Sequence, residues 1–306
     1  MQRFCMSAMT RTLCVVSTEG QGFVYDLALN PPHLRTRLQI AGGAIGHLDQ
    51  NEDAVVFSLG RDGYHIHSKD SGGLRGILHP KHTRNIYHII HPTIILHSAE
   101  LEEFPPSSEY RFPPAEIRRD QLLPTQLKHG EHPARRSLVS LEEDEWGAGM
   151  LYNNYIVGVS RGGRIFISSD WQGALSKPET AEATSAIIET EETGIHFDLG
   201  GWLSVYNDRV LFEVNDAVYI FTLSTDSKLP KADENQPPIF ATQTSSGNAY
   251  AVPVSFMAVF DDCLMFTYTT IGQESLLPRI SNLLPRQLPT KAIRILSLAP
   301  DMEDTK

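Results

Sequence analysis

The sequence predicts an all-β protein, and three observations support this. First, one unit recurs along the chain: an apolar strand, a small turn, a second strand of alternating apolar residues, and a polar turn. Recurrence at roughly 40–50 residues is typical of β-propeller blades. Second, residue pairs that favour tight hairpins separate the strands; third, no heptad pattern or long amphipathic helix occurs. We therefore predict a β-propeller or partial propeller of about five to six blade-like units, with a β-sandwich as the alternative.

The first two units carry the most regular strands. Phe23 and Tyr25 alternate with Val24 along one strand, so the two aromatic side chains should share a face. In the second unit the Asp62-Gly63 pair predicts a hairpin, because this pair readily adopts positive φ angles. The strands expected in these units are Cys14–Val16, Phe23–Leu27, Leu38–Ile40, Ala54–Leu59, Tyr64–Ser68 and Leu74–Leu78.

The third unit and the region after it are less regular. Ile86–Ile90 and Thr93–His97 fit a further pair of strands. From residue 100 to 136, prolines lie among charged residues, a composition that favours neither helix nor sheet and cannot bury a core. We therefore expect an exposed or disordered insertion over residues 100–136.

Regular strands return after this insertion. Ala183–Glu189 fits either a short helix or a strand, and the pairs Asn207-Asp208 and Asn215-Asp216 are typical of tight hairpins. The strands expected here are Ser137–Leu141, Gly149–Val159 with a turn in it, Arg164–Ser168, Trp202–Tyr206, Arg209–Val214, Val218–Leu223, Phe256–Phe260, Leu264–Tyr268 and Ala292–Leu298.

The chain is long enough to form one large domain. Its 306 residues can bury a sizeable core, and a single propeller can use such a length. Hydrophobic residues make up 41% and charged residues 21%, which is the usual balance for a globular protein. We predict one propeller-like domain over residues 1–306, with polar loops at 176–193 and 225–250 besides the insertion.

Charge and the N-terminal sequence argue against several classes of protein. A net charge of −11 does not suit nucleic-acid binding, because neutralising phosphates needs a basic face. No apolar run reaches membrane-spanning length, and the start lacks the apolar stretch of a secretory signal. Arg3 and Arg11 loosely fit a transit peptide, but Leu13–Val16 already has the pattern of a strand. The cysteines have no paired spacing, which favours a reducing cytoplasmic or nuclear location; they are Cys5, Cys14 and Cys263.

Patterns for catalysis and metal binding are weak. Histidines crowd residues 65–97, yet no His-Glu-x-x-His pattern and no nearby cysteine accompany them, so we predict no metal site. Gly158–Gly162 matches the Gly-x-Ser-x-Gly string of a nucleophile elbow. Ser160, however, stands between two expected strands, whereas the elbow leads from a strand into a helix. We therefore predict a hairpin turn there, and the sequence indicates neither a catalytic residue nor a cofactor.

Four residues are candidates for contact with a protein partner. Trp171 follows Ser168-Ser169-Asp170, where a WD-type blade carries an Asp-aromatic pair. A structural role at the blade edge is the default for this tryptophan, and an exposed tryptophan would instead anchor a partner. The candidates for partner binding are Trp171, Tyr64, His65 and His67.

Three segments carry a family resemblance. Ile45–Leu78, Val205–Leu223 and Ala258–Gly272 resemble, in their blade pattern, the C-terminal propeller-like region of fungal F-box proteins. The resemblance extends over most of residues 10–300. It implies a substrate-recognition subunit of SCF ubiquitin ligases, in which an N-terminal F-box binds the Skp adaptor and the propeller presents a target.

The F-box itself is missing from this pattern. No helical segment led by Leu-Pro occurs, and Leu123-Pro124 stands in the proline-rich insertion without an apolar helical run after it. A Skp adaptor is therefore an expected partner only if an F-box precedes this sequence.

Two functional hypotheses follow. The first is a non-enzymatic protein-interaction module whose loops grip an unidentified protein, with no nucleic acid and no membrane as partner. The alternative is a propeller enzyme, a hydrolase or lyase, with its site at the central channel. That alternative is motivated by Asp62, His65 and His67 in one hairpin and by Asp208 and Asp216 in similar turns.

Overall fold

The structure is a computed structural model of the 306-residue chain. It describes residues 3–40, 45–90, 123–131, 140–190, 202–214, 217–223, 239–243, 251–260, 263–273 and 287–297. Strands make up nearly all of the regular structure in these ranges; the exceptions are two α-helices and one 3-10 turn, η1 (Pro80–His82). The all-β prediction is confirmed.

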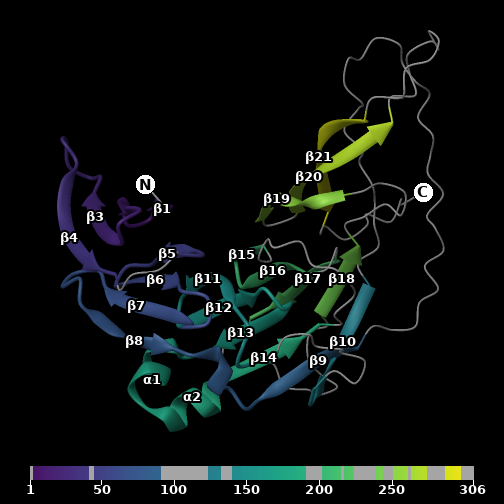
Figure 1. The fold of residues 1–306 in the computed structure, drawn as a ribbon, viewed down its shortest axis with the longest axis horizontal. Coiled ribbons are helices and arrows are strands. Elements are labelled where there is room, and N and C mark those ends of the chain that lie inside the picture. The colour runs from purple at the N-terminus through teal and green to yellow at the C-terminus, as the bar shows by residue number, and fades with distance from the viewer. Residues whose placement is uncertain are drawn as a thin grey trace, which may run out of the picture.

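Small antiparallel sheets follow one another around an arc that begins at the N-terminal sheet (Figure 1). We name the four-stranded units blades 1 to 4. Blade 1 contains β1 (Arg3–Ser7), β2 (Thr12–Val16), β3 (Gln21–Asp26) and β4 (His33–Gln39). Blade 2 contains β5 (Leu48–Gln50), β6 (Ala54–Ser58), β7 (Tyr64–Ser68) and β8 (Leu74–Leu78). Blade 3 contains β11 (Trp146–Tyr152), β12 (Tyr155–Ser160), β13 (Arg164–Ser168) and β14 (Ser185–Glu189). Blade 4 contains β15 (Leu203–Tyr206), β16 (Arg209–Val214), β17 (Ala217–Thr222) and β18 (Ile239–Gln243).

A three-stranded sheet follows blade 4 along the chain. Its strands are β19 (Ala251–Val259), β20 (Cys263–Gln273) and β21 (Gln287–Ser297), paired in that order. The strand β19 contacts β15, the first strand of blade 4, so this sheet continues the series of blades. The described part of the structure thus has four complete blades, against the five to six units expected, and a three-stranded sheet that adds an incomplete fifth unit.

The tight turns inside blades follow the local sequence. Gly63, which ends the turn between β6 and β7, has a φ of +77°, as the Asp-Gly pair predicts. Asn207 and Asp208 join β15 to β16 with φ angles of 48° and 59°, as a two-residue hairpin requires. The predicted turn at Asn215-Asp216 lies outside the described residues.

Three apolar cores lie between successive blades. The first joins blades 1 and 2 through residues such as Val24 and Phe57, and the second joins blades 2 and 3 through Ile66 and Phe166. The third, between blades 3 and 4, includes Val157 and is the largest. Burying one such aliphatic or aromatic side chain stabilises a fold by about 1.5–3 kcal/mol. This face-to-face packing of consecutive small sheets is the arrangement of a propeller, and it is not that of the β-sandwich alternative.

Two further strands connect the outer edges of blades 3 and 4. The strand β9 (Ile86–Ile90) pairs in parallel with β14, and β10 (Leu123–His129) pairs antiparallel with both β9 and β18. One ten-stranded sheet results. Ile86–Ile90 therefore does not begin a blade, which explains part of the difference in blade count; its expected partner Thr93–His97 lies outside the described residues.

Regular structure also occurs in three spans that were expected to be loops. The strand β10 lies within residues 100–136, and its Leu127 packs against the core between blades 3 and 4. The span 225–250 contains β18, and the span 176–193 contains β14, which matches the strand option for Ala183–Glu189. For β10 and β18, pairing with a distant strand supplies stabilisation that composition alone does not reveal.

Two short helices link β13 to β14. They are α1 (Trp171–Ser176) and α2 (Pro178–Thr184). The Asp170 carboxylate caps α1 by accepting a hydrogen bond from the Gly173 N–H at 2.9 Å. The helix α1 contacts β8, so this link also ties blade 3 to the outer strand of blade 2.

Candidate functional site

All four residues predicted to bind a partner are buried. Tyr64 is 0%, Trp171 1%, His67 2% and His65 7% exposed. The ring centroids of His65 and His67 lie 5.7 and 5.0 Å from that of Phe57. Burial lowers the pKa of both histidines. These side chains pack between strands and sheets, and their part in binding a partner remains an untested prediction.

Tyr64 connects blade 2 to blade 3. Its ring stacks on Phe166 at a centroid distance of 6.0 Å, and its hydroxyl donates a hydrogen bond to the Ala148 carbonyl at 2.9 Å. A Cβ atom at Gly149 or at Gly158 would overlap the Tyr64 ring or hydroxyl. Both glycines thus make room for this tyrosine, and burial raises its pKa well above the usual value.

The Gly-x-Ser-x-Gly string belongs to a structural network. Ser160 is 1% exposed, and its Oγ accepts a hydrogen bond from the Arg164 N–H at 2.9 Å. The Gly162 N–H donates to the Asp144 carboxylate at 2.9 Å, and Arg164 Nη1 donates to the same carboxylate at 2.6 Å. Arg164 Nε reaches Glu189 Oε1 at 3.1 Å. The string joins β12 to β13, as predicted, and its polar atoms hold that hairpin in place.

The residues of the enzyme alternative do not form one cluster. Asp62 is exposed in the turn after β6 and lies close enough to His65 to act on its charge. Asp208 stands in the turn before β16, and its N–H donates to the Tyr152 hydroxyl at 2.9 Å. The strands β6 and β16 are each the second strand of their blade; Asp62 follows β6, whereas Asp208 precedes β16, so the two turns lie at opposite ends of equivalent strands. Asp216 lies outside the described residues. The geometry therefore does not support a joint site.

A partly buried junction of ionisable groups lies where blades 1, 2 and 3 meet. Cys5 Sγ donates to Asp49 Oδ1 at 3.6 Å, and the Leu151 N–H donates to Asp49 Oδ2 at 2.8 Å. His47 Nδ1 lies 3.0 Å from the Gly149 carbonyl oxygen. Burial raises the pKa of Cys5 to about 12, raises that of Asp49 and lowers that of His47. A thiol held protonated is a poor nucleophile.

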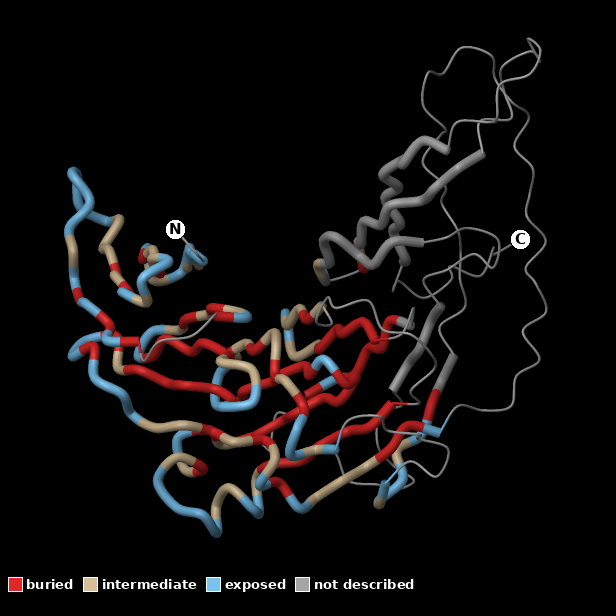
Figure 2. The backbone as a smooth tube through the Cα atoms, in the orientation of Figure 1, coloured by how far each residue is buried: buried red, intermediate tan, exposed pale blue. Residues whose placement is uncertain are grey.

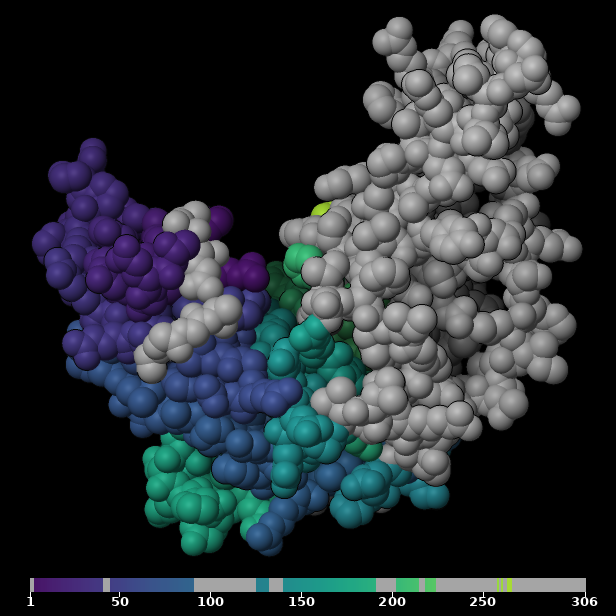
Figure 3. Space-filling view, in the orientation of Figure 1, coloured from purple at the N-terminus to yellow at the C-terminus, as the bar shows by residue number. Residues whose placement is uncertain are grey.

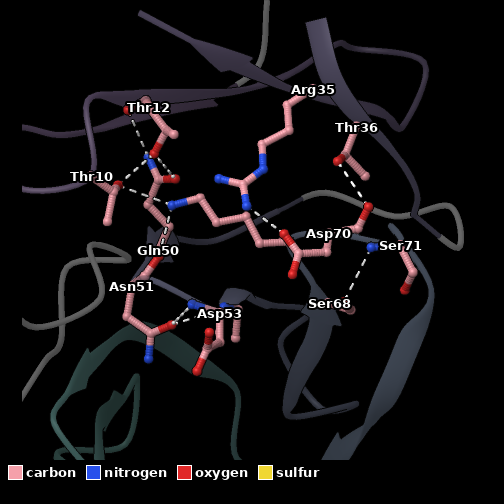
Figure 4. A network of polar contacts seen from close by, with 12 residues as sticks. Thr10, Thr12, Arg35, Thr36, Gln50, Asn51, Asp53, Ser68, Asp70 and Ser71 are labelled. Atoms are coloured by element: carbon pink, nitrogen blue, oxygen red, sulfur yellow. Dashed lines mark hydrogen bonds and ion pairs between the residues drawn. The ribbon is translucent and has the colours of Figure 1, made fainter. Parts of the chain in front are cut away.

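A second polar network joins blades 1 and 2 (Figure 4). The Lys69 side chain is fully buried, and its Nζ donates to Thr10 Oγ1 at 3.1 Å and to the Asn51 carbonyl at 2.7 Å. Gln50 Nε2 donates to the Thr12 carbonyl at 3.2 Å, while its Oε1 accepts from Thr12 Oγ1 at 2.9 Å. Burial is the main cause that lowers the pKa of Lys69. No sequence pattern reveals this network, because its partners come from separate strands and turns.

Exposed apolar side chains gather on blade 1. Phe4 is 61%, Met6 63%, Met9 84% and Leu29 54% exposed. In blade 1, β2 alternates between buried and partly exposed residues and β1 has no buried residue, whereas β6, β12 and β13 are buried throughout (Figure 2). Blade 1 also forms one end of the arc (Figure 3). It is therefore the candidate surface for contact with another protein.

The described ranges contain neither a cluster of metal ligands nor a membrane-spanning helix. No three side chains of His, Cys, Asp or Glu converge there as metal ligands would. No helix among those residues is long and apolar enough to cross a membrane.

Comparisons with known proteins give only distant likenesses. No family model and no curated protein matches the sequence. The β-propeller domain of Myceliophteria thermophila Cps50 (Swd1) is similar with a TM-score of 0.39 and 11% identity, over 89% of this chain and 79% of that one. The C-terminal WD40 domain of Sif2 has a TM-score of 0.39 and 9% identity, over 99% of this chain and 72% of that one. Kluyveromyces lactis Hsv2p has a TM-score of 0.41 and 13% identity, over 88% of this chain and 60% of that one. These scores are too low to add to the argument, so the assignment as a propeller rests on the four blades and their packing.

Proposed function

We propose that this protein is a non-enzymatic protein-interaction module built on a β-propeller. One contrast carries the proposal: the side chains that resemble catalytic groups are buried in structural contacts, whereas apolar side chains are exposed on blade 1. Ser160 and His67 are 1% and 2% exposed, and Phe4 and Met6 are 61% and 63% exposed. Exposed apolar side chains that gather on one surface are typical of sites for protein contact.

A narrower form of this proposal follows from the sequence resemblance. The module would be the substrate-recognition part of an F-box-type ubiquitin-ligase receptor, acting in the cytoplasm or nucleus. An F-box N-terminal to this propeller would bind the Skp adaptor, and the propeller would bind the target. This form is supported by the blade patterns of Ile45–Leu78 and Val205–Leu223, which fall in blades 2 and 4.

Affinity purification from the native host tests both forms. The full chain, shown to be folded by circular dichroism, should recover the same protein partner reproducibly. Recovery of a Skp adaptor with it would support the narrower form. Folded bait that recovers nothing above background would refute the proposal.

A matched enzymatic test uses Ser160→Ala. Because Ser160 Oγ accepts a backbone hydrogen bond inside the hairpin and is 1% exposed, this variant should leave any esterase activity of the purified protein unchanged. Complete loss of such activity would favour the hydrolase alternative.

A further inference from the structure

The two faces of blade 1 differ in how far their side chains are buried. One face carries Cys14, Val16 and Val24, each 0% exposed, and packs on blade 2. We name the opposite face the outer face of blade 1. Strand register places its residues in two cross-strand rows: Met6, Leu13, Tyr25 and Leu34, and beside them Phe4, Val15, Phe23 and Arg37.

The outer face is apolar, and no element of the described part of the chain covers it. Phe4 and Met6 are exposed on β1, and Leu13, Val15 and Phe23 are only partly buried. The substantial contacts of β1–β4 outside their own sheet are with blade 2. A sheet that is apolar on its second face as well as on its packed face usually buries that second face against another layer.

The charge of blade 1 differs in sign from that of the whole protein. Residues 3–40 contain four arginines against two carboxylates, a net charge of +2, while the whole chain has −11. One of these arginines, Arg35, pairs with Asp70 of blade 2. Arg37 ends one apolar row and is exposed. Asp26 alternates onto the face that packs on blade 2, and Glu19 stands in the turn between β2 and β3. The outer face therefore favours a partner that carries acidic residues next to apolar ones.

The dimensions of the two rows fit one kind of element. Rows on alternate residues lie about 7 Å apart, and each spans four strands, or about 14 Å. An α-helix is about 10 Å wide, and three turns of it are about 16 Å long. We propose that the outer face of blade 1 is the docking surface for an acidic amphipathic helix of a partner protein. This inference rests on the proposed function and specifies the chemistry of the partner.

Two other occupants fit the charges less well. A second copy bound through the same face would bring two positively charged surfaces together, Arg37 among their residues. The sequences of β19, β20 and β21 contain no acidic residue, so that sheet offers no complement to Arg37 either.

Two synthetic helical peptides of about four turns test the inference on the full chain. They share one leucine stripe, and their polar positions are glutamate in one peptide and lysine in the other. Fluorescence anisotropy should show binding of the glutamate peptide, weakening at high salt. The double variant Phe4→Ser/Met6→Ser should weaken it at least about ten-fold. Leu74→Ser, which alters a side chain 53% exposed on blade 2, is the matched control and should leave affinity unchanged.

Charge reversal provides the second arm. Arg37→Glu should weaken binding of the glutamate peptide and strengthen binding of the lysine peptide. Equal binding of both peptides to the parent chain, or no binding of either, would overturn the inference. Self-association in sedimentation that disappears in Phe4→Ser/Met6→Ser would assign the face to a second copy and also overturn it.

The native partner distinguishes this inference from the proposed function. If Phe4→Ser/Met6→Ser still recovers the partner that the parent chain recovers, the docking surface is elsewhere and the proposed function stands. If the folded parent chain recovers no partner, the proposed function itself fails.

Discussion

Replacing Asp144 by alanine should destabilise the protein by about 3 kcal/mol. Asp144 is 2% exposed, and its carboxylate accepts hydrogen bonds from the N–H groups of Gly162 and Glu145, each at 2.9 Å. It also accepts the 2.6 Å bond from Arg164 Nη1. Removing one partner of a buried ion pair costs about 3–5 kcal/mol. Arg164 keeps its contact with Glu189 at 3.1 Å, so we expect the lower end of that range.

Two further variants test whether the loss of stability comes from the buried charge of Asp144. Asp144→Asn keeps an oxygen for the backbone donors and loses the charge-assisted bond, which is worth about 1.5–3 kcal/mol. It should therefore cost less than the alanine variant. Glu145→Gln is the matched control: it removes the same charge one residue later, from a side chain 42% exposed that pairs with Arg161 at 2.8 Å. A surface pair of this kind contributes less than about 1 kcal/mol.

Urea unfolding followed by tryptophan fluorescence measures these differences. Trp146 is 1% exposed and packs in the core between blades 2 and 3, so it reports on the region that Asp144 holds. Circular dichroism should give a coincident transition if unfolding is two-state. Equal losses for Asp144→Ala and Glu145→Gln would show that the buried network contributes nothing specific, and the reasoning would be wrong.

Three other predictions concern buried groups. Gly158→Ala should unfold the protein at lower urea, because the added methyl group overlaps the Tyr64 hydroxyl; an unchanged midpoint would contradict that packing. Burial raises the pKa of Cys14 to about 12, so iodoacetamide at mildly alkaline pH should modify this thiol, by mass spectrometry, only after unfolding. Burial lowers the pKa of His47 below 6.5, so the unfolded chain binds more protons and stability should fall as the pH drops through that value, by up to about 1.4 kcal/mol per pH unit. The raised pKa of Asp49 acts in the opposite sense at lower pH, and His47→Gln should flatten the loss between neutral pH and about pH 5 in urea titrations.

The strands and turns inside blades could be predicted because they depend on nearby residues. The Asp62-Gly63 and Asn207-Asp208 pairs act within a single hairpin, and side-chain alternation acts within a single strand. The number of blades could not be predicted in this way. Ile86–Ile90 has an ordinary strand pattern, and only its parallel pairing with β14, about a hundred residues later, removes it from the series of blades.

The candidate site was harder to predict for the same reason. Asp49 bonds across 44 residues to Cys5 and across 102 residues to Leu151, and no short motif encodes such contacts. The burial of the aromatic and histidine candidates for partner binding could not be predicted from local sequence either. Trp171 has the sequence context of a blade edge, yet its exposure depends on how α1 packs against β8.

Buried polar contacts recur at the blade interfaces, and they suggest how the outer face of blade 1 would recognise a partner. Lys69 joins blades 1 and 2, the Tyr64 hydroxyl joins blades 2 and 3, and the Tyr152 hydroxyl joins blades 3 and 4. A polar group buried between apolar sheets costs free energy unless its partner is in place, so each contact favours one register of its two sheets. On the outer face only Arg37 is charged among the residues of the two rows. Phe4 and its apolar neighbours would therefore supply most of the affinity, while Arg37 would select a partner with an acidic residue at the matching position.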